Sequence, residues 1–336
     1  MDDKIRFVIS GIAGVLILSI FLYYLGIERL IESIKNASLT SILIGLSFYL
    51  VFFVVRSLRW QIILIPIKNR TSFQNLFTIT ILGWFTNSII PIRIGELVRA
   101  VLLKNREDIL ISEGLSSIVI ERIFDLAGLV VVGGAMFYFL PDDASIPKEF
   151  ASFILLVLGF IAFSILLLLL LNYRYDALIF PVRKFVSVVF WFSKGIKDRI
   201  LENLTLAINA MLSICKSKYM VPIFLLSIIT WLSPCFMYLY FFRAFNINFH
   251  WSVIFLGSVL VTLTFLIPSA PGYLGTFEAA WVFVYLGLGI AVEKALPVGL
   301  AVHFTTLFFI IVLGYIGLVI YGIGRRDVFG MISERI

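Results

Sequence analysis

Long, continuous apolar runs are the feature that most constrains the fold of this chain. Several extend far enough to cross a hydrocarbon core of about 30 Å, which takes roughly 20 helical residues. They do not alternate between apolar and polar residues, which excludes a membrane β-barrel. Composition agrees, because 61% of the 336 residues are hydrophobic and 14% are charged, whereas about a quarter of a soluble domain is charged. The sequence therefore predicts an all-α polytopic membrane protein.

The apolar runs divide the chain into candidate spans. The first, residues 7–25, follows two basic residues but lacks a small-x-small cleavage site and is long for a signal peptide, so we interpret it as a retained helix. A shorter apolar piece lies at 94–103, and a long mixed segment lies at 173–219. The further candidate spans are 38–55, 73–90, 116–140, 151–172, 220–242, 251–267, 276–291 and 297–322.

Lysine and arginine are distributed unequally among the loops, and the excess marks the cytoplasmic side. The loops at 56–72 and 104–113, the segment 173–219 and both termini are basic, whereas the other loops hold few cations. We therefore interpret the formal net charge of +7 as one cytoplasmic face, and not as a nucleic-acid-binding surface. The pattern predicts a multi-pass protein of the cell membrane with cytoplasmic N and C termini.

Two stretches are expected to enter and leave the membrane on the same side. The basic loops on either side of 73–103 require this, since the piece at 94–103 would be only about 15 Å long as a helix. Residues 73–103 therefore predict a re-entrant hairpin that breaks near Pro91. By the same argument 251–291 predicts a second hairpin from the outer side, broken at PSAPGYLG, residues 268–275.

Six spanning helices and two re-entrant hairpins then form an inverted-topology repeat, with units at 1–140 and 141–336. Broken helices near the midplane mark the binding site of many transporters with this plan. The halves share little sequence beyond a proline followed by glycine and glutamate, at Pro91, Gly95 and Glu96 and again at Pro271, Gly275 and Glu278.

Segment 173–219 interleaves aromatic and basic residues. This pattern favours an interfacial amphipathic helix on anionic lipid headgroups. A helical linker packed on the bundle is the alternative.

The first break carries candidate substrate-binding residues. Broken helices persist in hydrocarbon only where protein or water satisfies the backbone, so we expect a polar cavity there. Arg93, Glu96 and Arg99 are three residues apart, so on a helix Glu96 could pair with either arginine. A guanidinium suits phosphate, and Asn87 and Ser88 add neutral donors. In the alternative interpretation both arginines snorkel to the cytoplasmic surface and neutralise Glu96.

The fourth candidate span holds a second group of charges, in IERIFDL. Glu121 and Asp125 share a helix face and would repel each other unless a cation lay nearby. Intramembrane ionisable residues indicate function by default. Ligand contact by Glu121, Arg122 and Asp125 and structural pairing with arginines of the hairpin both remain open.

The second break places Glu278 beside Tyr273. A buried carboxylate without a cation could carry a proton, or Glu278 could cap the half-helix that begins near Thr276. His303 could be a pH-sensitive partner or a hydrogen-bonded packing residue.

Arg56 and Arg59, in VVRSLRW, could contact lipid phosphates, although interfacial anchoring beside Trp60 is favoured. A disulfide between the two cysteines is not expected, because Cys235 lies within an apolar run. The sequence contains no metal-ligand spacing, phosphate-binding loop or nucleophile–base pair, so no metal and no cofactor is expected and an ordinary enzyme is disfavoured.

Three motifs in order carry a family resemblance: N-x-x-x-P-x-R-x-G-E-x-x-R from Asn87 to Arg99, E-R-x-x-D from Glu121 to Asp125, and P-x-x-P-G-x-L-G-x-x-E from Pro268 to Glu278. They resemble the flippase-like membrane domain of lysyl-phosphatidylglycerol synthases, a family with many stand-alone members. The resemblance implies movement of a phosphate-headed lipid between leaflets. The synthases add a soluble aminoacyl-transferase domain, which these 336 residues lack, so transport is expected and lysyl-lipid synthesis is not.

The leading substrate is a polyprenyl-phosphate-linked sugar, and an aminoacylated or ordinary phospholipid is the alternative. The rival functions are a membrane-embedded transferase subunit and a scaffold for glycosyltransferase partners.

Overall fold

The computed structural model describes residues 35–90, 94–142, 146–171, 198, 201–202, 218–265 and 271–321. Within them the chain is all-helical, with nine α-helices, one short 3-10 turn, η2 (Pro271–Tyr273), and no strand. The predictions for 7–25, Pro91, Arg93, Pro268 and most of 173–219 lie outside the described residues. The α-helices are α3 (Leu39–Leu64), α4 (Phe73–Ile89), α5 (Gly95–Glu107), α6 (Ile111–Tyr138), α7 (Lys148–Leu171), α10 (Met220–Ala244), α11 (Trp251–Thr264), α12 (Thr276–Gly287) and α13 (Val292–Tyr321).

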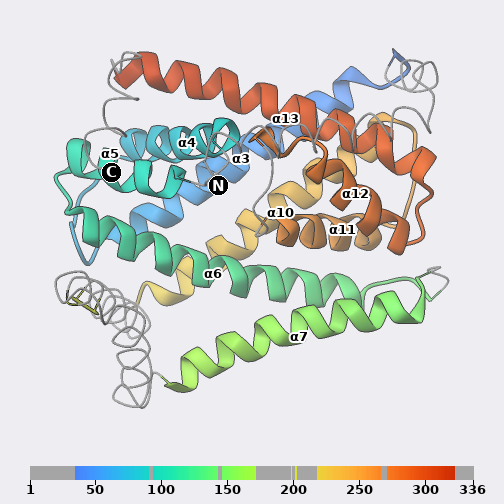
Figure 1. Ribbon diagram of the computed structural model, residues 1–336, viewed down its shortest axis with the longest axis horizontal. Coiled ribbons are helices and arrows are strands. Elements are labelled where there is room, and N and C mark those ends of the chain that lie inside the picture. The colour runs from blue at the N-terminus through green and yellow to red at the C-terminus, as the bar shows by residue number, and fades with distance from the viewer. Residues whose placement is uncertain are drawn as a thin grey trace, which may run out of the picture.

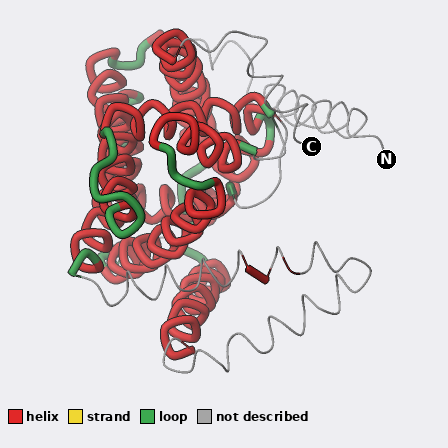
Figure 2. The backbone as a smooth tube through the Cα atoms, turned by 90° about the vertical axis from the view of Figure 1, so that its left-hand side faces the viewer, coloured by secondary structure: helices red, strands yellow, loops and turns green. Residues whose placement is uncertain are grey.

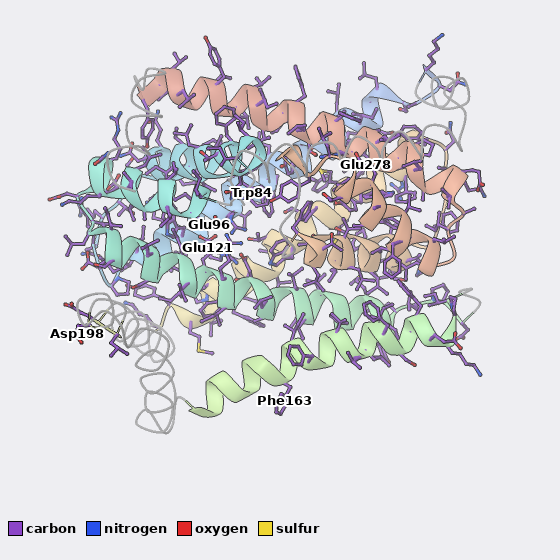
Figure 3. The ribbon with its side chains drawn as sticks, in the orientation of Figure 1. Trp84, Glu96, Glu121, Phe163, Asp198 and Glu278 are labelled. Atoms are coloured by element: carbon purple, nitrogen blue, oxygen red, sulfur yellow. The ribbon has the colours of Figure 1, made fainter. Side chains whose placement is uncertain are left out.

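Three of the described helices, α3, α10 and α13, are long and apolar enough to cross a membrane by length and composition. Large apolar side chains are exposed on the body, such as Leu43 (58%) and Phe308 (69%), as a lipid-facing surface requires. Helix α7 lies at the edge of the bundle (Figure 2), and its exposed Phe163 side chain points away from the body (Figure 3). The all-helical membrane class is confirmed, whereas the six spans stay a prediction.

The predicted end of the second span was wrong. Helix α3 continues to Leu64 and not to residue 55, because apolar residues follow VVRSLRW and pack into the core, with Ile63 and Leu64 fully buried. Arg56 and Arg59 therefore lie inside a helix, and not in a basic loop. The loop that precedes α4 retains Lys68 and Arg70 as its basic residues.

Helices α4 and α5 pack together as a hairpin. Where α4 begins and α5 ends, the Glu107 carboxylate accepts hydrogen bonds from the Ser72 amide at 3.1 Å and from Asn75 Nδ2 at 2.6 Å. Near the break the backbones touch, since a Cβ on Gly95 would lie 2.1 Å from the Gly83 carbonyl oxygen. The chain thus enters and leaves this hairpin at one end of the molecule.

Helices α11 and α12 form a second hairpin. The Tyr285 hydroxyl, late in α12, donates to the Ile254 carbonyl, early in α11, at 3.0 Å. Gly257 permits this approach, because a Cβ there would lie 2.3 Å from the Tyr285 ring.

The two hairpins open at opposite ends of the bundle. Helices α3 and α10 are antiparallel, since the Ser38 amide bonds the Ala244 carbonyl at one end and Arg59 bonds Ser227 at the other. Each of these helices leads by a short loop into its hairpin. Figure 1 accordingly shows α4 and α5 at one end and α11 and α12 at the other, with α13 and α6 spanning both. Entry of the hairpins from opposite membrane faces, and the repeat itself, stay predictions.

This orientation predicts the sidedness of chemical labelling. In a cysteine-free background, single cysteines at the exposed positions Arg70 and Asp108 should react with an impermeant maleimide only from the cytoplasm. Cysteines at Asn248 and Glu293, beside the other hairpin, should react only from outside. Labelling of all four positions from one face would contradict the opposed arrangement.

Candidate functional site

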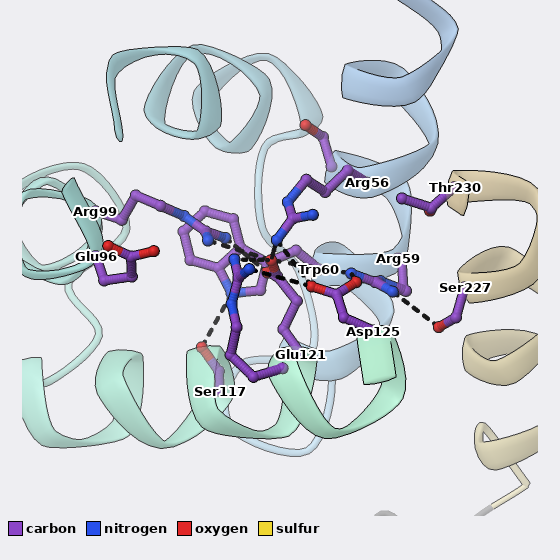
Figure 4. Close-up of polar contacts among 12 residues, drawn as sticks. Arg56, Arg59, Trp60, Glu96, Arg99, Ser117, Glu121, Asp125, Ser227 and Thr230 are labelled. Atoms are coloured by element: carbon purple, nitrogen blue, oxygen red, sulfur yellow. Dashed lines mark hydrogen bonds and ion pairs between the residues drawn. The ribbon is translucent and has the colours of Figure 1, made fainter. Parts of the chain in front are cut away.

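Four arginines and two carboxylates meet between α3, α5 and α6, and we call this group the arginine cluster. Figure 4 shows Arg56, Arg59 and Arg99 converging on Glu121 and Asp125. The fourth arginine, Arg122, follows Glu121 on α6. Helix geometry explains the convergence, because Arg56 and Arg59, and likewise Glu121 and Asp125, lie three or four residues apart on one helix face.

Glu121 lies at the centre of the cluster and is fully buried. Its carboxylate accepts hydrogen bonds from Arg56 Nη2, from Arg99 Nη2 at 2.7 Å and from Arg122 Nη2 at 3.2 Å. A buried carboxylate is tolerated only with such partners. Glu121 therefore joins three helices through one side chain.

Asp125, one turn further along α6, completes the pairing. Its oxygens accept from Arg59 Nη2 at 2.6 Å and from Arg56 Nη2 at 3.1 Å, and Arg122 Nη1 lies 3.3 Å away. Arg59 also donates to the Ser227 hydroxyl of α10 at 2.8 Å, which ties the cluster to the second half of the chain.

The Trp60 ring forms an apolar cover beside the cluster. The Arg99 guanidinium lies 4.1 Å from the ring centroid, within cation–π range. The indole N–H donates to the Ser117 hydroxyl at 2.9 Å, which fixes the ring in place.

The described part of the cluster carries more positive than negative charge, with four guanidinium groups facing two carboxylates. Arg56 and Arg59 are fully buried, and Arg56 Nε and Nη1 and Arg59 Nε have no hydrogen-bond partner there. Buried charge is stable only when paired. The arrangement is therefore one that an anion would complete.

Glu96 does not pair with Arg99, which corrects one of the two pairings that the sequence offered, while the other, with Arg93, lies outside the described residues. Among the described residues, Glu96 Oε2 instead accepts from Asn87 Nδ2 at 3.3 Å, while Asn87 Oδ1 accepts from the Gly95 amide at 2.8 Å. Asn87 thus links the two sides of the first break. Arg99 is 2% exposed, so it does not snorkel to the surface.

The second break holds a separate polar pair. His303 Nδ1 lies 2.6 Å from Glu278 Oε1, and His303 Nε2 lies 2.6 Å from the Gly272 carbonyl oxygen. Glu278 Oε2 accepts from the Gly275 amide at 2.8 Å, which closes a cap at the start of α12. Glu278 therefore has a basic partner after all, contributed by α13.

A cavity of about 330 Å³ joins the two breaks. Its polar wall includes Asn87, Glu96, Arg122 and Asp125 from the first half and His303 from the second. The Arg122 side chain is 40% exposed, in contrast to the buried arginines behind it. The remaining wall is mostly apolar and aromatic and includes Phe52, Trp84, Leu126, Leu129, Trp231, Met237, Phe265, Tyr273, Phe277 and Leu307.

The structure thus brings the predicted residues into two groups, with Glu96 and Glu121 in one and Glu278 in the other (Figure 3), and members of both groups line the cavity. Arg56 and Arg59 lie at the centre of the arginine cluster, although the sequence favoured a role for them as anchors at the membrane interface. Sequence analysis missed Ser117 and Ser227. The signal for Arg56 and Arg59 was present, since apolar residues 62–64 follow them and extend the helix.

Comparison with known proteins identifies the family. Residues 7–314 match the family described as the lysylphosphatidylglycerol synthase TM region. The chain belongs to this family. The resemblance drawn from the three motifs is confirmed.

Members similar to this chain include UPF0104 membrane proteins from archaea. One from Methanothermobacter thermautotrophicus is 26% identical over 298 residues, covering 86% of each chain. One from Pyrococcus horikoshii is 25% identical over 304 residues, covering 85% of this chain and 88% of the relative. Glycosyltransferase AglD of Haloferax volcanii is 28% identical over 149 residues, 43% of this chain and 24% of that protein. No solved structure matches.

Proposed function

We propose that this member of the lysylphosphatidylglycerol synthase TM family moves a phosphate-headed lipid between membrane leaflets. The observation that carries the proposal is the arginine excess beside a cavity that joins two helix breaks. The membrane location and the family agree with a lipid-related role.

The phosphate would lie against Arg122. This side chain lines the cavity and is already oriented by Glu121 at 3.2 Å and Asp125 at 3.3 Å. A guanidinium binds phosphate with a planar pair of donors, and the charge of Arg56, Arg59 and Arg99 behind it adds long-range attraction. Asn87 and Ser88 are further polar groups on the same wall.

The rest of the headgroup would occupy the aromatic part of the cavity. A volume of about 330 Å³ lies at the lower end of the range for ligand pockets. Trp84, Trp231 and Tyr273 offer flat apolar surfaces with polar edges. The lipid tails would remain in the bilayer beside the exposed apolar faces.

A polyprenyl-phosphate-linked sugar is the leading substrate. The similarity of part of the chain to a protein named as a glycosyltransferase favours a sugar-bearing cargo. We further propose that segment 173–219 binds anionic lipid headgroups and that glycosyltransferases are partners of this protein. The alternatives are an aminoacylated or ordinary phospholipid as cargo, a transferase activity and a scaffold.

Leaflet sidedness in proteoliposomes tests these functions. The purified protein is reconstituted with a fluorescent polyprenyl-phosphate sugar, phosphatidylglycerol or lysyl-phosphatidylglycerol, and a membrane-impermeant quencher reports the outer fraction. We expect the sugar lipid to equilibrate at least about tenfold faster than in protein-free vesicles. Preferential movement of a phospholipid would reassign the cargo. No movement of any lipid would contradict the transport proposal, and sugar transfer from an added donor would favour the transferase.

Arg122→Gln should slow transport by about 10- to 100-fold, since a charge-assisted hydrogen bond contributes about 1.5–3 kcal/mol. The transport rate of Arg122→Lys should lie between those of the wild type and Arg122→Gln, because an ammonium keeps the charge but lacks the planar donor pair. The matched control is Arg243→Gln, which removes an exposed arginine that packs over Tyr240 at the end of α10. Wild-type transport by Arg122→Gln would remove Arg122 from the site.

A further inference from the structure

The Glu278–His303 pair takes no part in the arginine cluster, and it reaches the cavity through His303, which lines the wall. Its side chains are 0% and 7% exposed. Each member also contacts the backbone of the second break, His303 through the Gly272 carbonyl and Glu278 through the Gly275 amide. The pair therefore fastens both ends of the stretch 272–275 to α12 and α13.

Hydrogen-bond chemistry fixes the number of protons in this pair. A carbonyl oxygen only accepts, so Nε2 of His303 carries a proton toward Gly272. The 2.6 Å contact between Nδ1 and Glu278 Oε1 needs another proton, because a carboxylate and an unprotonated ring nitrogen are both acceptors. Glu278 Oε2 already accepts from Gly275. One proton is therefore shared between Oε1 and Nδ1, whichever atom holds it.

We infer that the Glu278–His303 pair is a proton-binding site that latches η2 to α13 and couples transport to protons. The coupling, but not the proton site, rests on the proposed function. When the shared proton leaves, the imidazole keeps a single N–H. The carboxylate is the stronger acceptor, so that N–H faces Glu278 and the Nε2 lone pair faces the Gly272 carbonyl. Two acceptors then oppose each other, and the contact with Gly272 is lost.

Loss of the His303–Gly272 contact would affect the place where the two helix breaks approach each other. Gly272 has φ 62°, lines the cavity, and a Cβ there would lie 3.7 Å from the Ser88 carbonyl oxygen of α4. The hydrogen bond from His303 to the Gly272 carbonyl fastens this left-handed turn to α13. Loss of the proton would therefore loosen the junction between the two hairpins.

Few other ionisable groups surround the pair. Helices α4 and α11 carry no Asp, Glu, Lys, Arg or His, and on α13 the nearest such groups, Glu293 and Lys294, precede His303 by about 15 Å of helix. The remaining titratable or charged groups are Tyr285 of α12 and, on the described cavity wall, Tyr49 of α3, Tyr238 of α10, Tyr273 of η2, Glu96 of α5, and Arg122 and Asp125 of α6.

Hydrogen exchange in the reconstituted protein tests the latch without any transported lipid. In Glu278→Gln the amide N–H₂ donates to Nδ1 and the amide oxygen accepts from Gly275, so this variant reproduces the protonated pair at every pH. At pH 9 the amides of 272–275 should exchange about tenfold faster in the wild type than in Glu278→Gln, and at pH 6 equally. In His303→Ala the amides of 272–275 should exchange fast at both pH values. Thr305→Val, two residues from His303 and outside the cavity, is the control and should follow the wild type.

Equal exchange in wild type and Glu278→Gln at pH 9 would overturn the proton site. If Glu278→Gln failed to fold, the wild type and His303→Ala would be compared instead. The exchange rates of amides 272–275 in the wild type should approach those in His303→Ala as the pH rises. A difference between the two proteins that stayed constant with pH would overturn the proton site. Coupling is tested in proteoliposomes with an imposed pH gradient, which should drive lipid accumulation by the wild type and not by Glu278→Gln. Equal gradient dependence in both would overturn the coupling. Absence of transport in the wild type would contradict the proposed function while leaving the exchange result to decide the proton site.

Discussion

Glu121→Gln should produce the largest loss of stability of any single substitution in the cluster. The change leaves four guanidinium groups around one carboxylate, at a position that is fully buried. Breaking one buried ion pair by removing a partner costs about 3–5 kcal/mol, and Glu121 pairs with Arg56, Arg99 and Arg122 at once. We expect a low yield of monodisperse protein and a thermal unfolding midpoint lowered by at least about 5 °C.

The matched control for that experiment is Glu113→Gln, two turns earlier on the same helix. Among the described residues, the Glu113 carboxylate accepts a single hydrogen bond, from the Leu110 amide at 3.1 Å, as part of the N-terminal cap of α6. A glutamine oxygen can accept the same hydrogen bond, so this substitution should cost no more than the roughly 1 kcal/mol of a lost cap. Equal unfolding midpoints for the two variants would show that Glu121 does not hold the cluster together.

Gly95→Ala is expected to disrupt the first hairpin. The added Cβ would lie 2.1 Å from the Gly83 carbonyl oxygen and 2.6 Å from Asn87 Oδ1. The first of these is a backbone atom, so α4 and α5 must separate, and overpacking of this kind costs about 1–3 kcal/mol or more. Separation would also break the Asn87–Gly95 hydrogen bond and move Arg99 away from Glu121. Transport and thermal stability should therefore fall together.

Gly134→Ala, on α6, is the matched control for Gly95→Ala. A Cβ at Gly134 meets nothing within 4 Å, and alanine is the better helix former by about 1 kcal/mol. This variant should unfold at the same temperature as the wild type or slightly higher. An unfolding midpoint for Gly95→Ala equal to that of Gly134→Ala would mean that the close helix contact is not required.

Continuous apolar runs and helix breakers predicted most of the described helices, because burial and backbone hydrogen bonding in an apolar medium leave few choices. Local sequence predicted a helix end before Gly95, and it offered the cap at Glu278 as one of two alternatives. Pairing between distant segments was not accessible in the same way. Arg99 is only three residues from Glu96, yet it pairs with Glu121, because α6 packs against the hairpin and brings Glu121 within reach. Glu96 instead accepts a hydrogen bond from Asn87.

The end of α3 illustrates the same limit. Positive charge is costly in hydrocarbon, so Arg56 and Arg59 read as the end of a span at residue 55. Their partners lie 65 and 66 positions away, at Glu121 and Asp125. No local pattern reports a contact over that distance, whereas the fold makes it the centre of the candidate site.

That separation along the chain has a consequence for biogenesis. At about 5–20 residues per second, the ribosome needs several seconds to pass from Arg56 to Glu121, and throughout this time both arginines of α3 lack their carboxylates. During that interval the insertion machinery meets a segment whose apolar part ends at residue 55, with Arg56 and Arg59 held at the headgroups. Only when α6 is threaded can α3 slide inward by its last nine residues, to Leu64. We therefore expect α3 to be inserted provisionally and then shifted in register, so that a delay in making α6 would leave α3 exposed to membrane quality control.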